Sequence, residues 1–186
     1  MVDELWIIRH GETEWSRSGR HTGSTDLPLT ERGEELAARL RERLGDVHFD
    51  LVLTSPRARA RRTAELAGFP QAEVDVDLAE WDYGDYEGVT TEEIREHDPG
   101  WSVWTHPSPG GEKAAEVGAR LDRVVDRVRA QGGRVLAFGH GHASRALAVR
   151  WLGLPVADGR HFQLGTATIS VLGYHREDPV VARWNC

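Results

Sequence analysis

Short apolar runs alternate along this chain with longer stretches in which apolar residues recur every three or four positions. Short runs are typical of buried strands, and a period near 3.6 is typical of a helix that buries one face. The segments that this pattern predicts as strands are Leu5–Ile8, Asp50–Thr54, Val74–Val76 and Arg134–Phe138, followed by a terminal hairpin of Ala167–Leu172 and Val180–Trp184 with Pro179 in its turn.

Helical segments separate these strands. In the first of them leucines recur every four positions after a threonine, a residue type favoured at helix N-caps, and a glycine follows the last leucine. Because helices and strands alternate, we expect a three-layer α/β/α sandwich with a mostly parallel central sheet. The predicted helices lie between Thr30 and Gly45, between Ser55 and Gly68, around Val117 as far as Gly132, and from Gly141 to about Leu152.

The stretch from Leu78 to Gly111 breaks the alternation with aromatic residues, glycines and prolines. Within it only Thr90–Glu93, which matches a capping box, predicts a short helix. A connection of this length is more often functional than passive. We therefore expect one domain spanning residues 1–186 with a lid-like insertion at about 81–111. Three tryptophans of this stretch are expected to serve packing rather than sugar stacking: Trp81, Trp101 and Trp104.

The composition excludes several classes of protein. The 186 residues carry a formal net charge of −7, whereas a protein that binds duplex nucleic acid usually presents a basic face. No apolar run approaches the about 20 residues of a membrane span, and the acidic N-terminus is unlike a secretory signal. Cys186 is the only cysteine, which rules out a disulfide framework and a thiolate zinc site. We expect a cytoplasmic protein that binds neither nucleic acid nor membranes.

Chemically active side chains follow each of the predicted parallel strands. In open α/β sheets, ligands bind beyond the carboxyl ends of the strands, so these side chains are placed to share one pocket. They are Arg9 and His10 after the first strand, Arg57 and Arg59 after the second, Glu80 after the third, and His140 and His142 after the fourth.

This set of side chains suits phosphoryl transfer. Two arginines can hold a phosphate dianion through forked hydrogen bonds. A neutral imidazole can attack phosphorus, a second imidazole can donate to a nonbridging oxygen, and a carboxylic acid can protonate the leaving oxygen. Such positioning and charge neutralisation supply most of what the reaction needs.

Several of these residues have rival interpretations. Asp82 lies two residues from Glu80 and is an alternative acid. His140 and His142 have the spacing of a two-histidine metal motif, but the glycine between them and the lack of a nearby cysteine disfavour a metal. The helix after Ser55 also carries arginines that we expect on its solvated face, the first of which could steer substrate: Arg57, Arg61 and Arg62.

The block Arg9–Trp15 resembles the signature of the histidine phosphatase superfamily, the phosphoglycerate mutase-like clan. One Arg-His-Gly triplet would be weak support, but five blocks occur in the family's order and span nearly the whole chain. The later blocks are Thr25–Thr30, Ser55-Pro56 with Arg59-Ala60 and Thr63-Ala64, Glu80 with Gly84 and Glu87-Gly88, and His140-Gly141.

The resemblance implies a role for each matched residue. His10 would be the phosphorylated nucleophile and Glu80 the proton donor. The phosphate ligands would be Arg9, Arg59 and His140. The substrate contacts would be Ser16, Thr22, Gly23, Tyr83 and His142. The resemblance implies neither a metal ion nor a cofactor.

Within this family the residues favour a phosphatase over a mutase. Ser16 and His142 stand where many relatives and the mutases, respectively, have asparagine. The candidate lid, residues 86–111, contains one basic residue, Arg95, against five acidic residues, and an acidic lid is poorly suited to caging a polyanion. We therefore expect a phosphomonoesterase that hydrolyses small phosphorylated metabolites, sugar phosphates or bisphosphates, through a phosphohistidine.

Three alternatives stay open at this point. One is a cofactor-dependent phosphoglycerate mutase, and another is a phosphatase that acts on protein phosphohistidine or phosphotyrosine. The third is a catalytically silent phosphate-binding module, whose mark would be the loss of a catalytic position, and none of the five is missing. The sequence leaves the oligomeric state open.

Overall fold

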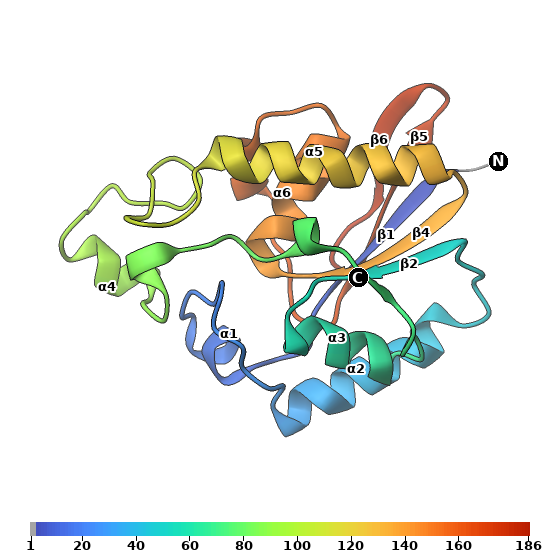
Figure 1. The fold of residues 1–186 in the computed structure, drawn as a ribbon, viewed down its shortest axis with the longest axis horizontal. Helices are drawn as coiled ribbons and strands as arrows, with labels where there is room; N and C mark the ends of the chain where they lie inside the picture. The colour runs from blue at the N-terminus through green and yellow to red at the C-terminus, as the bar shows by residue number, and fades with distance from the viewer. Residues whose placement is uncertain (1–2) are drawn as a thin grey trace.

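One six-stranded sheet forms the centre of the molecule. The computed structural model describes residues 3–186. The strands are β1 (Glu4–Arg9), β2 (Leu51–Thr54), β3 (Glu73–Val74), β4 (Arg134–Gly139), β5 (Ile169–His175) and β6 (Asp178–Arg183). They lie in the order β3-β2-β4-β1-β5-β6. The first four in this order are parallel, and β5 and β6 extend the sheet as an antiparallel hairpin (Figure 1).

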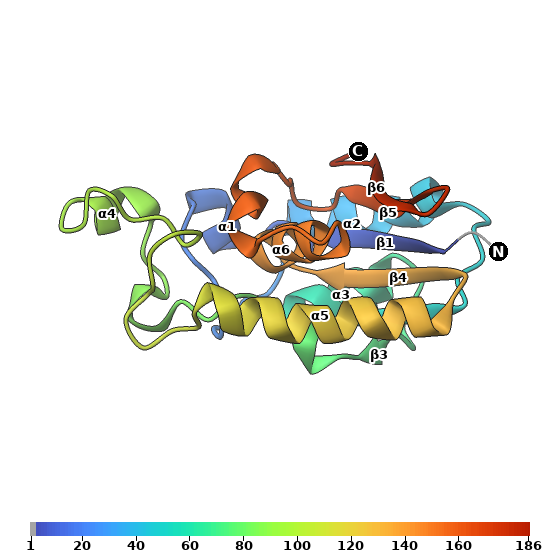
Figure 2. The same ribbon diagram turned by 90° about the horizontal axis from the view of Figure 1, so that it is seen from above.

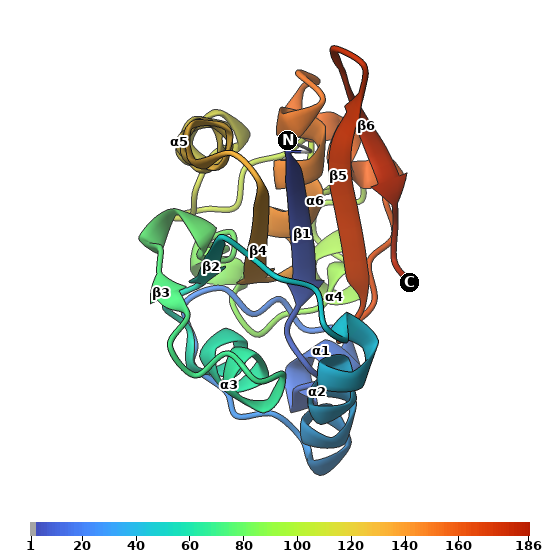
Figure 3. The ribbon, with the colours of Figure 1, turned by 90° about the vertical axis from the view of Figure 1, so that its right-hand side faces the viewer.

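Helices cover both faces of this sheet. They are α1 (Glu14–Ser18), α2 (Glu31–Leu44), α3 (Ala58–Leu66), α4 (Thr91–Arg95), α5 (Ala114–Gln131) and α6 (Gly141–Trp151), with short 3-10 helices η1 (Val76–Leu78), η2 (Gly84–Tyr86) and η3 (Val156–His161). α5 and α6 lie on one side of the sheet, and α2 and α3 lie on the other (Figure 3). The three-layer sandwich predicted from the sequence is confirmed.

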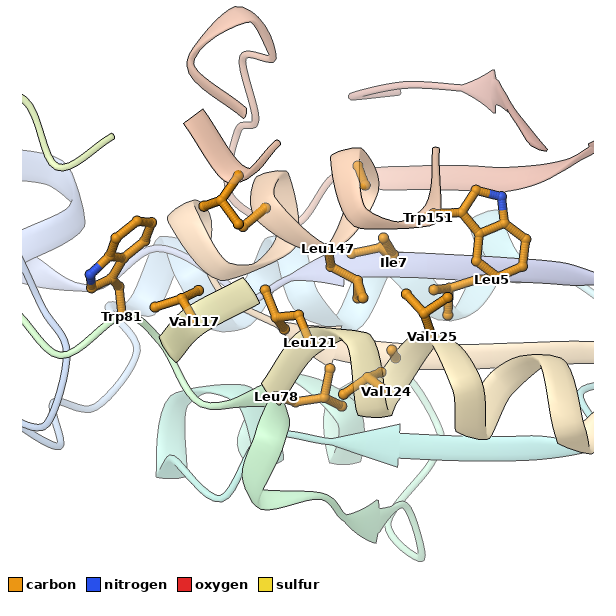
Figure 4. Close-up of a cluster of buried hydrophobic side chains, with 14 of the residues drawn as sticks. Leu5, Ile7, Leu78, Trp81, Val117, Leu121, Val124, Val125, Leu147 and Trp151 are labelled. Carbon is orange, nitrogen blue, oxygen red and sulfur yellow. The ribbon is translucent and has the colours of Figure 1, made fainter. Parts of the chain in front are cut away.

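Successive residues of β1 point to opposite faces of the sheet, as the pleat requires. Ile7 belongs to a buried cluster with Leu121 of α5 and Leu147 of α6 (Figure 4). Ile8 belongs to the cluster on the other face, with Leu40 of α2. None of these side chains is more than 1% exposed. Burying each of them contributes about 1.5–3 kcal/mol, which holds the two helix layers against the sheet.

The caps predicted from the sequence for α2 and α4 are present, whereas the predicted Ser55 cap of α3 is wrong, because Arg57 is its N-cap. Thr30 accepts a hydrogen bond from the N–H of Gly33 at 3.0 Å. α2 ends immediately before Gly45, whose φ of +56° favours glycine. Thr90 and Glu93 form the reciprocal capping box that begins α4. These ends are fixed by local hydrogen bonds, which is why the sequence alone indicates them.

Two helices differ from the sequence prediction. α1 lies in a stretch without an apolar repeat, where the sequence predicts no helix. Thr13 caps it, and Ser16 completes the capping box in place of the usual Glu or Gln. α3 begins at Ala58 rather than directly after Ser55, because the Ser55 hydroxyl accepts the N–H of Arg57 and turns inward to a buried histidine.

Two strand predictions are also corrected. β3 ends at Val74, and Val76 begins η1 instead of extending the strand. Pro179 lies within β6, paired with Tyr174, and not in the turn of the hairpin. β6 is an edge strand, so the missing N–H of proline costs no ladder hydrogen bond there.

The segment 81–111 lies beyond the carboxyl ends of the parallel strands, together with α1 (Figures 1 and 2). Trp81 and Trp101 are 1% exposed and Trp104 is 6% exposed, so these side chains form part of the core. Whether this segment acts as a lid stays a prediction. Within residues 3–186, no helix combines the length and the apolar character that a membrane crossing needs.

Candidate active site

The parallel strands end side by side and bring together the residues that follow them. Ile8 of β1 and Thr54 of β2 both pair with Phe138 of β4. His10 and His140 come directly after β1 and β4. Their ring centroids are 5.2 Å apart, and the ring planes make an angle of 63°. The register of the sheet therefore places the two buried imidazoles in contact.

One ring nitrogen of His10 forms a hydrogen bond with the backbone. Nδ1 lies 2.7 Å from the carbonyl oxygen of Gly11, so Nδ1 carries the proton and Nε2 carries the lone pair. Burial, followed by the positive charges of Arg59 and Arg9, lowers the pKa of His10 well below 6.5. The imidazole is therefore neutral at physiological pH, which is the form that can act as a nucleophile.

Arg9 and Arg59 are held beside the imidazoles by backbone carbonyl groups. Arg9 donates to the carbonyl of Leu164 at 2.6 Å. Arg59 is fully buried and donates to the carbonyls of Thr22 and Thr25, each at 2.9 Å. Burial lowers the pKa of both guanidinium groups, and the nearby carboxylate of the predicted proton donor opposes this shift. The backbone thus fixes two cations next to His10.

Nitrogen atoms without a protein partner gather around this point. Among the described residues, six buried side-chain polar atoms form no hydrogen bond, and four of them belong to this group: Arg9 Nε, Arg57 Nε, Arg59 Nε and His140 Nδ1. Buried polar groups nearly always have a partner, so the cluster suits a ligand with several acceptor atoms. Guanidinium groups favour planar or tetrahedral oxyanions. Arg57, expected on a solvated face, is half-buried here.

Glu80 is fixed at the start of α6. Its carboxylate accepts hydrogen bonds from the backbone N–H groups of Trp81 at 2.9 Å, Ala143 at 2.7 Å and His142 at 3.0 Å. A carboxylate is favoured at this position because the helix dipole presents partial positive charge there. The side chain faces the same pocket as His10, so it can exchange a proton with a group bound beside that imidazole.

The wall of this pocket contains most of the residues that the sequence predicts. The pocket has a volume of about 240 Å³. The predicted residues that line it are Arg9, His10, Ser16, Thr22, Glu80, Tyr83 and His142. The hydroxyl of Ser16 is already engaged by the backbone of Thr13, so this residue shapes the wall more than it offers a free donor.

Three predicted residues lie outside the pocket wall. Arg59 and His140 are 0% exposed and do not line the pocket. The amide of Gly23 donates to Glu87 at 2.9 Å, and its carbonyl accepts from Arg59 at 3.2 Å. A Cβ at Gly23 would lie 2.5 Å from a backbone oxygen, so this position serves a close approach of two chain segments.

The pocket also contains residues that the sequence analysis missed: Arg20, His21, Thr91 and Arg145. The guanidinium of Arg145 lies 4.6 Å from the ring centroid of Trp104. His21 stacks on Tyr83 at 4.7 Å between ring centroids. A helical spacing of three from His142 is the one signal that points to Arg145; the others lie in irregular or capping segments.

The rival interpretations lose support from the geometry. Asp82 is exposed, does not line the pocket, and accepts the N–H of Gly84. His140 bonds to Ser55, whereas His142 bonds to the Tyr83 hydroxyl at 2.6 Å. Within the described residues, no group of three His, Cys, Asp or Glu side chains is arranged to hold a metal ion.

Known proteins resemble this chain in both sequence and fold. The family model of the histidine phosphatase superfamily (branch 1) matches residues 5–186. An acid phosphatase of Mycobacterium tuberculosis is 47% identical over 91% of this chain and 86% of its own length. The sedoheptulose 1,7-bisphosphatase of Saccharomyces cerevisiae is 38% identical over 81% of this chain and 68% of its own length.

The structural comparison agrees with the sequence comparison. A solved structure of an open reading frame product of Mycobacterium tuberculosis superimposes with a TM-score of 0.94 and 44% identity. The superposition covers 98% of this chain and 96% of that chain. The family match, the blocks at the strand ends and the shared fold lead to one conclusion: the chain belongs to the histidine phosphatase superfamily.

Proposed function

We propose that the protein is a phosphomonoesterase that hydrolyses small sugar phosphates or bisphosphates through a phosphohistidine on His10. The observation that carries this proposal is a neutral imidazole with a free Nε2 lone pair among unpartnered guanidinium nitrogens. The names of two relatives, an acid phosphatase and a sedoheptulose 1,7-bisphosphatase, support hydrolysis of this class of ester.

The first step transfers the phosphoryl group to the enzyme. Arg9 and Arg59 neutralise the dianion, and Nε2 of His10 attacks phosphorus in line with the leaving oxygen. The P–O bond to the alcohol breaks as the P–N bond forms. Glu80 gives its proton to the leaving oxygen. The products of this step are a phosphohistidine, an ionised Glu80 and the free alcohol.

The second step returns the enzyme to its starting state. Glu80, now a carboxylate, takes a proton from a water molecule that attacks the phosphohistidine. The P–N bond breaks, and the electron pair returns to Nε2. Inorganic phosphate leaves, and Glu80 is protonated again. One carboxyl group therefore acts as acid and then as base, which one fixed position at the pocket wall allows.

The charge of the pocket favours small esters that carry a second anionic group. Arg20 and Arg145 line the pocket in addition to Arg9. The one Lys or Arg of the segment 86–111, Arg95, does not line the pocket and donates to the carbonyl of Trp101. The segment that would have to exclude water from a mutase therefore adds no free cation over the pocket. The pocket volume of about 240 Å³ lies below the about 300–1,000 Å³ of typical ligand pockets, which favours a small ester over a large one.

Replacing the nucleophile tests the proposal. His10→Ala should abolish phosphate release from sugar phosphates and, together with it, the acid-labile phosphoenzyme formed by wild type. His48→Ala is the matched control, because the side chain of His48 is 86% exposed. Phosphate release that survives in His10→Ala contradicts the proposal. Isomerisation of 3-phosphoglycerate faster than phosphate release would identify a mutase instead.

A further inference from the structure

Ser55 and His140 form a fully buried pair behind the pocket. Oγ of Ser55 lies 2.7 Å from Nε2 of His140, and both residues are 0% exposed. The N–H of Ser55 donates to the carbonyl of Phe138 at 2.9 Å. This bond ties the turn after β2 to the end of β4. The backbones of two neighbouring strands therefore hold the hydroxyl against the imidazole.

The proton between these two side chains follows from counting donors and acceptors. Oγ of Ser55 also accepts the N–H of Arg57 at 3.3 Å. Among the described residues, Nε2 of His140 is the one acceptor that the Ser55 hydroxyl proton reaches. If Nε2 were protonated, Ser55 would accept twice and its own proton would be buried without a partner, which is rare. The hydroxyl therefore donates, and Nε2 accepts.

The remaining ring nitrogen must then carry the proton of the neutral ring. Burial, followed by the charge of Arg59, lowers the pKa of His140 well below 6.5, and a neutral imidazole has one N–H. With Nε2 accepting from Ser55, that N–H is on Nδ1. Nδ1 is one of the buried nitrogens without a protein partner, and the ring lies against His10.

We infer that Ser55 is a positioning residue that fixes His140 as the Nδ1–H tautomer, so that His140 offers a hydrogen-bond donor to a nonbridging phosphate oxygen. The opposite tautomer would direct a lone pair at the anion and repel it. The identity of the anion rests on the proposed function, whereas the tautomer is a property of the protein without substrate.

The two imidazoles of the site thereby present opposite groups to the anion, a lone pair from His10 and an N–H from His140. The carbonyl of Gly11 accepts from Nδ1 of His10 and leaves Nε2 as a lone pair. The hydroxyl of Ser55 donates to Nε2 of His140 and leaves Nδ1 as a donor. One hydrogen bond to each ring thus suits His10 to act as the nucleophile and His140 to act as a phosphate ligand, although the two residues are of the same type.

Nuclear magnetic resonance of protein labelled with ¹⁵N at histidine tests the tautomer directly. Long-range ¹H–¹⁵N correlation should show a protonated Nδ1 and a bare Nε2 for His140 in wild type. In Ser55→Ala the two tautomers should mix. Ser144→Ala is the control, because Ser144 is buried on α6 and bonds to neither imidazole. A protonated Nε2 in wild type, or an unchanged spectrum in Ser55→Ala, overturns the inference.

Binding of inorganic phosphate gives a second readout. Ser55→Ala should weaken it by about tenfold, the order of one hydrogen bond to a charged group. His140→Asn places an amide N–H near the position of Nδ1 and should bind phosphate more tightly than His140→Gln. Equal affinity in Ser55→Ala and wild type contradicts the inference.

The outcomes separate the inference from the proposed function. If wild type never forms a phosphohistidine, the proposed function fails and the tautomer assignment stands. If the phosphoenzyme forms while the tautomer is the opposite one, the inference alone fails. The wild-type spectrum decides the tautomer even where Ser55→Ala does not fold.

Discussion

Glu80 owes its position to the backbone of other residues. Three N–H groups hold its carboxylate, and two of them belong to the first turn of α6. Its side chain shares the pocket wall with His10. In the proposed mechanism, a carboxyl group so restrained exchanges protons at one point of the pocket, with the leaving oxygen in the first step and with water in the second.

Glu80→Gln should therefore slow esters according to their leaving group. Turnover of alkyl phosphates should fall by about 10²- to 10⁴-fold, because their leaving oxygen needs a proton. Aryl phosphates, whose leaving groups need little protonation, should lose far less. The measurement is kcat for one ester of each kind. Asp82→Asn, at an exposed position outside the pocket, should change neither. Equal losses on both esters would remove Glu80 from the role of acid.

Residues with a local marker in the sequence could be predicted for the site. Arg9 ends the strand β1 and His10 directly follows it, and the carboxyl end of a strand is where ligands bind. His21 has no such marker: it lies in an irregular segment, and the tertiary path of that segment brings it to the pocket. Arg145 has a weaker marker, a spacing of one helical turn from His142. Apolar periodicity encodes neither approach.

At the scale of elements, α5 fastens the segment that carries Glu80. Arg120 of α5 is 8% exposed and donates to the carbonyls of Asp77, Ala79 and Glu80. It also forms an ion pair with Glu112 at 2.8 Å. The same carboxylate accepts a backbone N–H from the start of the insertion at 2.9 Å. One guanidinium thus joins a core helix to both ends of the segment 81–111.

Arg120→Met should destabilise the protein by about 1–3 kcal/mol, because the carbonyl groups of residues 77, 79 and 80 lose their donor, while Glu112, 25% exposed, keeps the N–H of Asp82. Arg123→Met is the matched control on the same helix. The side chain of Arg123 is 62% exposed in its ion pair with Asp77, and such pairs contribute about 0–1 kcal/mol. Denaturant unfolding of both variants provides the measurement. Similar losses in the two would show that the buried pair does not fasten the segment.

Elements with a repeated apolar face could be predicted well. α5 and α2 bury regular rows of aliphatic residues, α2 begins after a capping threonine, and both helices end immediately before a glycine. α1 could not be predicted, because its five residues include no buried side chain and its capping box uses Ser16. The start of α3 was misplaced because Ser55 bonds to His140, a residue 85 positions away in the chain. Tertiary contacts override local signals at these points.

For the whole molecule, one sheet unites distant parts of the sequence. The parallel order of β2, β4 and β1 brings residues near positions 10, 55 and 140 to one edge. The alternation of strands and helices predicted this edge. The alternation did not predict which segment covers this edge, because the segment 81–111 has no regular period and its path follows from buried tryptophans.

The same edge buries three imidazoles and half-buries a fourth, and this links stability to pH. Burial is the main cause that lowers the pKa of each of them: His10, His21, His140 and His142. In the unfolded chain a histidine titrates near 6.5. Below that pH the unfolded state binds more protons than the folded state, so the free energy of unfolding decreases as the pH falls. The contribution is complete above pH 6.5 and is lost in acid.

His21 allows this linkage to be measured at one position. It is 7% exposed, and burial lowers its pKa from 6.5 to about 4. Between pH 7.5 and pH 5, wild type should therefore lose about 2 kcal/mol more stability than His21→Phe, which keeps a ring against Tyr83 but binds no proton. Denaturant unfolding at both pH values measures this difference. His48→Phe, at an 86% exposed side chain, should behave as wild type. If His21→Phe loses as much stability in acid as wild type, the proton uptake lies elsewhere. Burial, which also lowers the pKa of His10, would then not reduce stability in acid at His21.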